Sequence, residues 1–383
     1  MRGAISLFLA ALFLAGCSRE ERYRVEGDSM LPGLRGETRE CVCPYCGYAG
    51  WVSARERGVC ANCLGVIPDA LLADGRVVPG EMVTVVACSG YNYDDVVVVL
   101  PDGKTPCVKR VVGCPGDRVA IRDGKIFVNG RRWVRTLSQW ERERILVHDD
   151  GFRPEGVSRW VSDDGWRATE KGWTTSERSA TLAYHHAEGR LETRFVEGEK
   201  TTSNVFYPSP VTNRLAGNGT AMRSEWTFPV SEFQLIFSVE KVSGTGRLEI
   251  FLPMGEEWGC FAIPAKEGEY LFSTLDGIPR AGEAVSVGRE PILESGSPEF
   301  PLPKIKWTGE GTVQITRITL FRGEFWLPDR RNSRNFSNFS QKTLAKEGDP
   351  GYYLVGDNSL RSEDSRRWGR VPAARIRGLV RRP

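Results

Sequence analysis

Alternating apolar and polar positions predict short β-strands along most of the chain. Val96–Leu100 is an apolar run, and Lys125–Val128 ends at Asn129-Gly130, a dipeptide typical of tight hairpins. From about residue 181, turn signals separate further alternating stretches: Leu191–Val196, Ser224–Phe228, Glu232–Val239, Arg247–Leu252 and Thr312–Phe321. Short strands at such spacing favour an all-β sandwich over residues 181–328.

The first apolar run, Ala4–Gly16, is shorter than the roughly 20 apolar residues that a membrane-spanning helix needs. It suits the apolar part of a signal peptide better. Leu14-Ala15-Gly16-Cys17 resembles a bacterial lipobox, in which the cysteine is lipidated. Residues 1–17 are therefore expected to be a signal peptide or a short membrane anchor. A lipid on Cys17 or an uncleaved anchor would hold the chain on the membrane, and a soluble cleaved product is the third option. All three place the bulk of the chain outside the cytoplasm.

A formal net charge of +3 over 383 residues is too small to indicate a nucleic-acid partner.

Three segments, far apart in the chain, carry groups that fit one active site. They are Gly27-Asp28-Ser29-Met30-Leu31-Pro32, then Lys109-Arg110 with Pro115-Gly116-Asp117, then Gly356-Asp357-Asn358 with Ser362-Glu363-Asp364-Ser365-Arg366 and Trp368-Gly369. Singly, each also fits an ordinary turn or strand end. In this order they resemble the motifs of the type I signal peptidases, the membrane-anchored Ser-Lys serine proteases of family S26.

A serine hydroxyl such as that of Ser29 is inert at neutral pH until a base removes its proton. The three histidines, His148, His185 and His186, lie outside the motifs, so they are poor candidates for that base. Lys109 lies among apolar residues, and burial lowers the pKa of a lysine from its usual value near 10.4. We therefore expect a Ser29/Lys109 dyad that needs no cofactor.

The resemblance implies roles for the third segment. Ser362 would hydrogen-bond the Lys109 amine and orient it. Asp364 would pair with Arg366 and stiffen the loop, with Asp357 and Asn358 as further supporting residues.

The resemblance also implies how the first segment binds substrate. Met30 would line the substrate groove, and Pro32 would fix the turn. The Ser29 backbone N–H would be the first oxyanion donor. Gly27 stands where some family members carry a serine hydroxyl as a second donor, so that donor is expected to be absent or replaced.

Two cysteine pairs suggest a metal site. Cys43 and Cys46 form one CxxC pair, and Cys60 and Cys63 form the other, at the spacing of a zinc ribbon. A structural zinc over residues 41–66 is one interpretation. Two disulfides remain the alternative, because an exported chain favours oxidation.

The segment 131–180 is charged and rich in tryptophan, with Trp133, Trp140, Trp160, Trp166 and Trp173. The sandwich after it weakly resembles concanavalin-like or laminin-G-like jelly rolls. Such sandwiches often bind sugars, so a glycan or protein ligand is one hypothesis. The alternative is that the aromatic side chains fill the core of the sandwich.

The expected fold is mainly β: an antiparallel signal-peptidase-like core at 20–40, 76–130 and 347–383, interrupted by the ribbon and the sandwich. The expected function is a serine endopeptidase that removes signal peptides from secretory precursors at the outer, periplasmic face of a bacterial cytoplasmic membrane. Two alternatives remain. One is another Ser-Lys protease with the same core, such as the self-cleaving repressors of the SOS response. The other is an exported lipoprotein whose sandwich binds glycan or protein on a peptidase scaffold.

Overall fold

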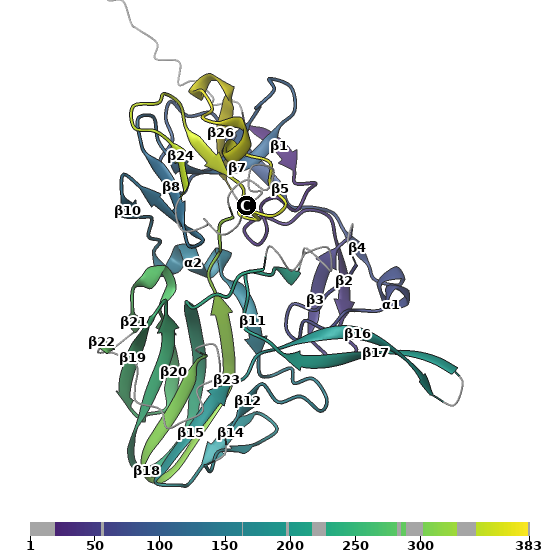
Figure 1. Cartoon of the computed structure of the whole chain (residues 1–383), viewed down its shortest axis with the longest axis vertical. Helices are drawn as coiled ribbons and strands as arrows, with labels where there is room; N and C mark the ends of the chain where they lie inside the picture. Colours follow the sequence, from purple (N-terminus) through teal and green to yellow (C-terminus); the bar gives the residue numbers. More distant parts are fainter. Residues whose placement is uncertain are drawn as a thin grey trace, which may run out of the picture.

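The computed structural model describes residues 20–54, 57–162, 164–196, 199–216, 227–281, 285–288, 302–327 and 342–381. Strands predominate and pair antiparallel throughout the described sheets, which confirms the predicted mainly-β fold (Figure 1). Cys17 and the predicted anchor at 1–17 lie outside the described residues. Within the described residues, no helix is long and apolar enough to cross a membrane.

Two sheets form the core that holds the three motifs. The larger has the order β1-β5-β26-β6-β7-β25, with β1 at Glu21–Arg24, β5 at Met82–Val86, β26 at Ile376–Arg381, β6 at Val96–Val99, β7 at Cys107–Gly113 and β25 at Tyr353–Val355. The smaller has the order β10-β9-β8-β24, with β10 at Arg131–Arg132, β9 at Lys125–Val128, β8 at Val119–Arg122 and β24 at Lys342–Ala345. Asn129 and Gly130 both have positive φ, as the predicted hairpin turn requires.

The hairpin of β6 and β7 explains why a lysine is buried here. Val97 lies opposite Lys109 in the register, and Val96 lies opposite Arg110. Because β6 consists of valines and lies inside the sheet, its partner strand is shielded from water, and so are both basic side chains of β7.

The ribbon follows the loop at residues 28–34, which carries Ser29. It consists of β2 (Thr38–Val42), β3 (Ala49–Ser53) and β4 (Val77–Val78), in the order β3-β2-β4, with the short helix α1 (Asp69–Ala73) beside them. We use the word ribbon for residues 37–78. Its interior is a small cluster around the cysteines, including Val52, Ile67 and Leu72.

The sandwich is an eleven-stranded sheet. Its strands are β11 (Ile145–Asp149), β12 (Trp160–Val161), β13 (Arg167–Ala168), β14 (Gly172–Thr175), β15 (Ser179–Tyr184), β18 (Phe233–Met254), β19 (Glu257–Pro264), β20 (Gly268–Ser273), β21 (Arg280–Ala281), β22 (Val285–Gly288) and β23 (Lys304–Arg322). The sheet therefore starts at β11, well before residue 181. The tryptophan-rich segment was expected to be separate, but its strands β11 and β14 pair with β23.

The stretches Glu232–Val239 and Arg247–Leu252, expected as two strands, are the two ends of the single strand β18. β18 pairs with β23 along nearly its whole length, with bulges after Ile236 and Val239. Both ends of β18 are buried and its middle is exposed. Gly244, at positive φ in that middle, lies so close to β23 that an added Cβ would overlap Glu310. Long strands that bend at bulges and glycines are how one sheet turns a corner and packs on itself.

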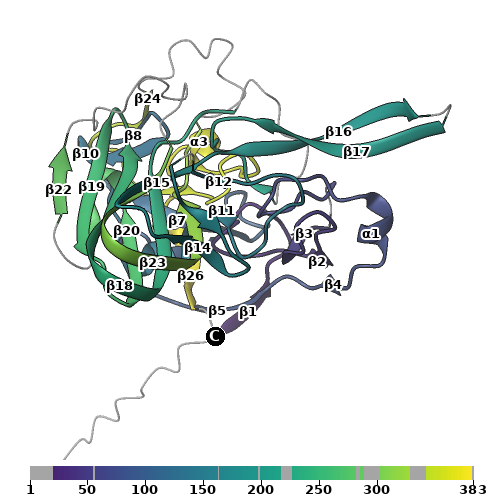
Figure 2. The same cartoon turned by 90° about the horizontal axis from the view of Figure 1, so that it is seen from below.

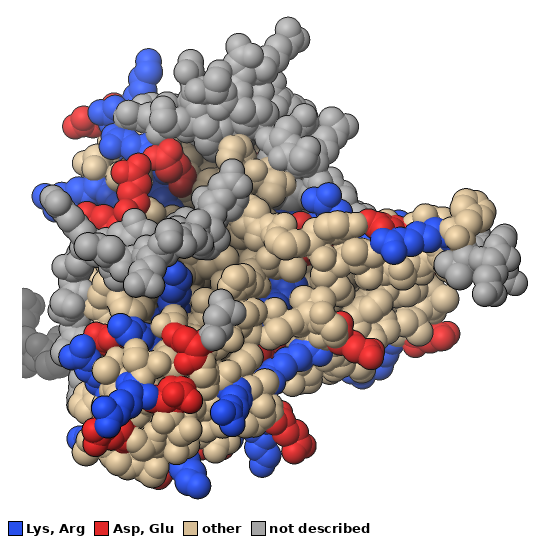
Figure 3. Space-filling view, turned by 60° about the horizontal axis from the view of Figure 1, so that its bottom comes forward, with Lys and Arg blue, Asp and Glu red and all other residues tan. Residues whose placement is uncertain are grey.

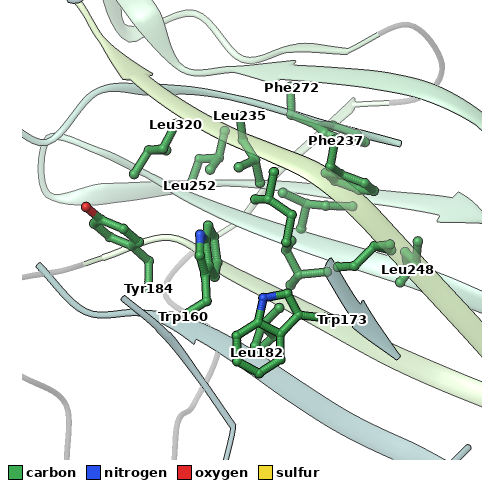
Figure 4. Close-up of a cluster of buried hydrophobic side chains, with 14 of the residues drawn as sticks. Trp160, Trp173, Leu182, Tyr184, Leu235, Phe237, Leu248, Leu252, Phe272 and Leu320 are labelled. Atoms are coloured by element: carbon green, nitrogen blue, oxygen red, sulfur yellow. The ribbon is translucent and has the colours of Figure 1, made fainter. Parts of the chain in front are cut away.

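The tryptophans lie mostly inside the sandwich. Trp160 is 0% exposed and packs edge to face against Tyr184, whose ring centroid is 5.3 Å away. Trp166 is buried in the same cluster, and so is Trp173, which Figure 4 shows near Trp160. These side chains fill the core, so they do not provide an exposed platform for sugar stacking.

A two-stranded arm, β16 (Ala187–Val196) with β17 (Glu199–Pro208), extends from the body (Figure 2). Its base contacts the ribbon, where Asn204 exchanges two hydrogen bonds with the backbone of Val66, at 2.8 and 3.2 Å. On the face shown in Figure 3, acidic and basic side chains of the described residues are interspersed over the sandwich and arm.

Between β15 and β18, part of the predicted strand Ser224–Phe228 lies outside the described residues. The described helices are few and short. Besides α1 they include α2 (Leu137–Glu143) and α3 (Ser365–Trp368), with single 3-10 turns at Leu275–Gly277 and Ala373–Arg375.

Candidate active site

The loop that carries Ser29 connects β1 to the ribbon and is held by the third motif. Asn358 donates its backbone N–H to the Ser29 carbonyl and its side-chain Nδ2 to the Asp28 carbonyl, both at 3.0 Å. The loop closes on itself, because Leu34 N–H donates to the Met30 carbonyl at 2.8 Å, and the Leu31–Pro32 peptide is cis. The residues at 28–34 and 356–358 thus meet although most of the chain lies between them.

Lys109 places its amine against Ser29. Nζ lies 3.3 Å from the Ser29 hydroxyl oxygen and donates to the Val108 carbonyl at 2.8 Å. The lysine is only 3% exposed. Burial lowers the pKa of the Lys109 amine below its usual value, and the nearby carboxylate of Asp364 opposes that shift only in part. The geometry and the direction of the pKa shift both fit a lysine that serves as a base.

Asp364 organises the supporting loop as expected. Its side chain caps α3, accepts from Gly356 N–H at 2.9 Å and pairs with Arg366 at 2.7 Å. Burial works to raise the pKa of this carboxyl, but the charge and hydrogen bonds of Arg366 lower it overall. Asp364 therefore stays ionised and ties the loop to β25.

Ser362 differs from the expectation. Its hydroxyl makes no hydrogen bond with any described residue, so the contact with Lys109 that the resemblance implied is not formed. The Lys109 amine instead contacts Val108 and Ser29. The Ser362 backbone N–H donates to Asn358 at 2.9 Å, and the hydroxyl lies over Gly356.

Met30 also differs from the expectation. Its side chain is 1% exposed and packs with Val25, Leu34 and Val83 beneath the loop. It therefore packs beneath the loop that carries Ser29 and does not line an open groove. Pro32, half-buried, follows the cis peptide in the same turn.

The Ser29 backbone N–H is the oxyanion donor that the resemblance implied. No described residue accepts a hydrogen bond from it. Gly27 borders open space, since a Cβ added there would meet no atom within 4 Å. The chain thus has room for a second donor at position 27 but no side chain to supply it.

A buried ion-pair network joins the inserted sandwich to the motifs. Arg110, next to Lys109, binds both oxygens of Asp357 at 2.7 Å and also pairs with Glu143 at the end of α2. Arg135, just before α2, pairs with Glu324, just after β23, at 2.7 Å. Burial raises the pKa of Glu324 to about 8. Both ends of the insertion therefore meet beside the active site.

The four cysteines of the CxxC pairs lie together, with their sulfur atoms all within 4.8 Å of one another. The Sγ separations are 3.6 Å for Cys43–Cys63 and 3.7 Å for Cys46–Cys60. A disulfide requires about 2.05 Å. Tetrahedral zinc with bonds of about 2.3 Å places its sulfur ligands about 3.8 Å apart. The geometry therefore fits four-thiolate coordination of a metal, and the nine described cysteines form no disulfide.

The cysteine cluster is connected on both sides. Asn62, between the second pair of cysteines, accepts from Asp149 N–H at 2.6 Å and donates to the Phe152 carbonyl at 2.7 Å. On the other side, Ser53 of β3 donates to the Asp28 carboxylate at 2.8 Å. The ribbon therefore links the sandwich to the residue that precedes Ser29.

Several of these contacts carry no sequence signal. Glu143, Glu324 and Ser53 belong to no recognisable motif, and their partners lie far away in the chain. Of the residues in these contacts, the motifs included Asp28, Arg110 and Asp357. A buried arginine needs an acidic partner, so the position of Arg110 beside an apolar strand indicated that such a partner exists without identifying it.

One comparison with known proteins bears on this site. The sequence model of a family described as "Signal peptidase, peptidase S26" matches residues 3–164 and 321–383, which is more than half of the chain. The unmatched stretch between them holds most of the sandwich and the arm. None of the curated proteins compared with the chain matches it significantly.

The close contact at Gly356 gives a test of the site's packing. A Cβ at this position would overlap the Ser362 hydroxyl and lie 2.5 Å from the Ser29 carbonyl oxygen. We expect Gly356→Ala to shift the Ser29 loop and to lower the free energy of unfolding by about 1–3 kcal/mol, in the range of overpacking. Urea unfolding measures this. Gly27→Ala, with open space around it, is the matched control, and equal destabilisation by both changes would contradict the packing.

Proposed function

The chain belongs to the S26 signal peptidase family, a family of serine peptidases, and from this we propose that it is an active endopeptidase that cleaves signal peptides with a Ser29/Lys109 dyad. The single observation that carries the proposal is the buried Lys109 amine 3.3 Å from the Ser29 hydroxyl. A lysine with no catalytic task is costly to bury, because its charged form loses hydration.

In the proposed reaction, neutral Lys109 accepts the Ser29 proton while the serine oxygen attacks the carbonyl carbon of the scissile peptide. The oxyanion that forms is stabilised by the Ser29 N–H. The Lys109 ammonium then gives its proton to the leaving amine, and the peptide C–N bond breaks to leave an acyl-enzyme. Water, activated by neutral Lys109, hydrolyses the ester and restores Ser29.

The proposed substrates are secretory precursors with signal peptides, because these are what the family name describes. We place the protein on the outer, periplasmic face of a bacterial cytoplasmic membrane, held by a short anchor or by a lipid on Cys17. Described β1 begins at Glu21, so Ser29 follows the proposed anchor closely. The alternative of a ligand-binding lipoprotein loses its main support, since Trp160, Trp166 and Trp173 are core residues.

We further propose that Cys43, Cys46, Cys60 and Cys63 hold a structural zinc ion. The metal would take no part in the chemistry at Ser29. Gly65 N–H approaches the Cys63 sulfur at 3.4 Å, and Asn62 Nδ2 approaches the Cys46 sulfur at 3.8 Å. Such outer donors support thiolate ligands.

The dyad is tested by cleavage of exported precursors in detergent. We expect Ser29→Ala and Lys109→Ala each to lower kcat/KM by at least about 10³-fold, as for other nucleophile and base removals. Ser138→Ala and Lys104→Ala, at exposed positions, are matched controls that should cleave at the wild-type rate. Equal cleavage by Ser29→Ala and wild type would refute the proposal.

The lowered pKa of Lys109 predicts two pH effects. Activity should rise with pH around a midpoint below 10.5, because only the neutral amine is a base. Between the pKa of Lys109 in the folded protein and 10.5, the unfolded chain binds more protons than the folded one. Buried Lys109 therefore lowers the free energy of unfolding at neutral pH, and this loss diminishes as the pH rises. Lys109→Met should therefore raise the Tm at neutral pH, and the gain should shrink toward pH 10.5. Rate profiles and thermal unfolding check both, with Lys104→Met as control. A rate midpoint at or above 10.5 would contradict the lysine base.

Zinc is tested by metal analysis of protein purified with and without reductant. We expect one zinc per chain in the wild type and in Cys41→Ser, and loss of zinc together with a lower Tm in Cys63→Ser. Chelation should likewise lower the Tm of the wild type, because metal binding contributes to folding free energy. Metal-free protein with two titratable disulfides would overturn the zinc assignment.

A further inference from the structure

The ribbon has two different faces. In the β2–β3 register, Thr38 lies opposite Ser53, Glu40 opposite Trp51 and Val42 opposite Ala49. Opposite residues of an antiparallel pair point to the same face, and neighbours along a strand point to opposite faces. Val52 therefore points to the cysteine cluster, where it is buried, and Trp51 points away from it.

The outer face lines a groove of about 690 Å³. Trp51 lies in it with the Arg35 guanidinium over its ring, 5.7 Å from the ring centroid. Apolar side chains beside it are exposed, with Val42 63% and Leu71 46% accessible. Charges of both signs complete the rim: Glu40 and Asp74 with Arg35 and Arg76. We call this surface the ribbon groove.

The strand face that holds the groove continues toward the loop at residues 28–34. Thr38 and Ser53 lie on this face beyond the lining of the groove and are buried, and Ser53 donates to Asp28, the residue before Ser29. Trp51 is two residues from Ser53 on the same strand face, which is a separation of about 7 Å. A peptide that passes Ser53 in this direction would therefore reach Trp51 within about two further extended residues.

We propose that the ribbon groove binds the part of the precursor that follows the cleavage site. The inference rests on the proposed function and extends it to a specific segment of the substrate. From the level of Ser53 to that of Ala49 the face covers about 13 Å, enough for about four extended residues. Its composition suits a peptide with one apolar side chain on Trp51 and Leu71 and polar neighbours of either charge.

The direction follows from the order of elements. In the chain, β1 precedes Ser29 and follows the proposed membrane anchor, whereas the ribbon follows Ser29. The signal segment of a precursor is itself held in the membrane, so it would lie on the β1 side. The released, mature part then lies toward the ribbon.

The test compares peptides of one precursor with two or eight residues after the scissile bond, and a further set lengthened on the signal side. With wild type, the longer mature side should lower KM about tenfold, and kcat should stay unchanged. Trp51→Ala should remove this advantage, a factor that corresponds to ~1.4 kcal/mol. Leu71→Ser, at an exposed position, should weaken it without a risk to folding. Phe195→Ala, 76% exposed on the arm, is the matched control and should keep it.

Two results would overturn the proposal: equal KM values for short and long peptides with wild type, or a loss in Trp51→Ala that depends on the signal side. Failure of the proposed function is distinguishable. If no precursor is cleaved, fluorescence anisotropy of a labelled eight-residue mature segment on Ser29→Ala still measures the groove. If Trp51→Ala and Leu71→Ser weaken this binding, the result supports the proposal for the ribbon groove. If neither variant changes the binding, the proposal is refuted.

Discussion

One constraint determines how this molecule is arranged: the Lys109 amine has to be shielded from water and also lie within reach of the Ser29 hydroxyl. Burial costs the charged form its hydration, so the surroundings must exclude water without providing a full counter-charge. The valines of β6 shield the Lys109 amine from water. The carboxylate of Asp364 pairs with Arg366, so it only partly opposes the lowering of the Lys109 pKa. The neighbour Arg110 has the opposite environment, with Asp357 and Glu143 against it. One strand thus carries a basic group that can lose its proton beside one that is held charged.

The insertions are built into this arrangement and are not simply appended to it. The ribbon contacts Asp28 through Ser53 and the sandwich through Asn62, and α2, which leads into the sandwich, contributes Glu143 to Arg110. Leaving a buried charge unpaired by removing its partner costs about 3–5 kcal/mol in other proteins. A change at these junctions is therefore transmitted to the loops that hold Ser29, even though no residue of the sandwich lies in the proposed chemistry.

The sequence allowed the motifs, the fold class and the four-cysteine cluster to be predicted, because each depends on residue type at short spacing. The hairpin turn at Asn129-Gly130 and the buried strand β6 were also predictable, because local turn preferences and the apolar run of valines determine them. The predictions that were wrong depend on long-range geometry. Two expected strands are one bent strand, β18, because the corner lies at glycines that resemble a turn signal. Met30 and Ser362 were assigned by resemblance, and their true partners are set by packing in three dimensions.

The pairing of Arg135 with Glu324 closes a long loop, because everything between them is the inserted sandwich. The strand β25 and the loop that positions Ser29 come only after Glu324 in the chain. Domains generally fold as units, and N-terminal ones first, during synthesis. Ser29 and Lys109 are therefore made early but remain without their supporting loop until residues 356–366 have been synthesised. The sandwich is therefore synthesised before the loop that completes the proposed active site.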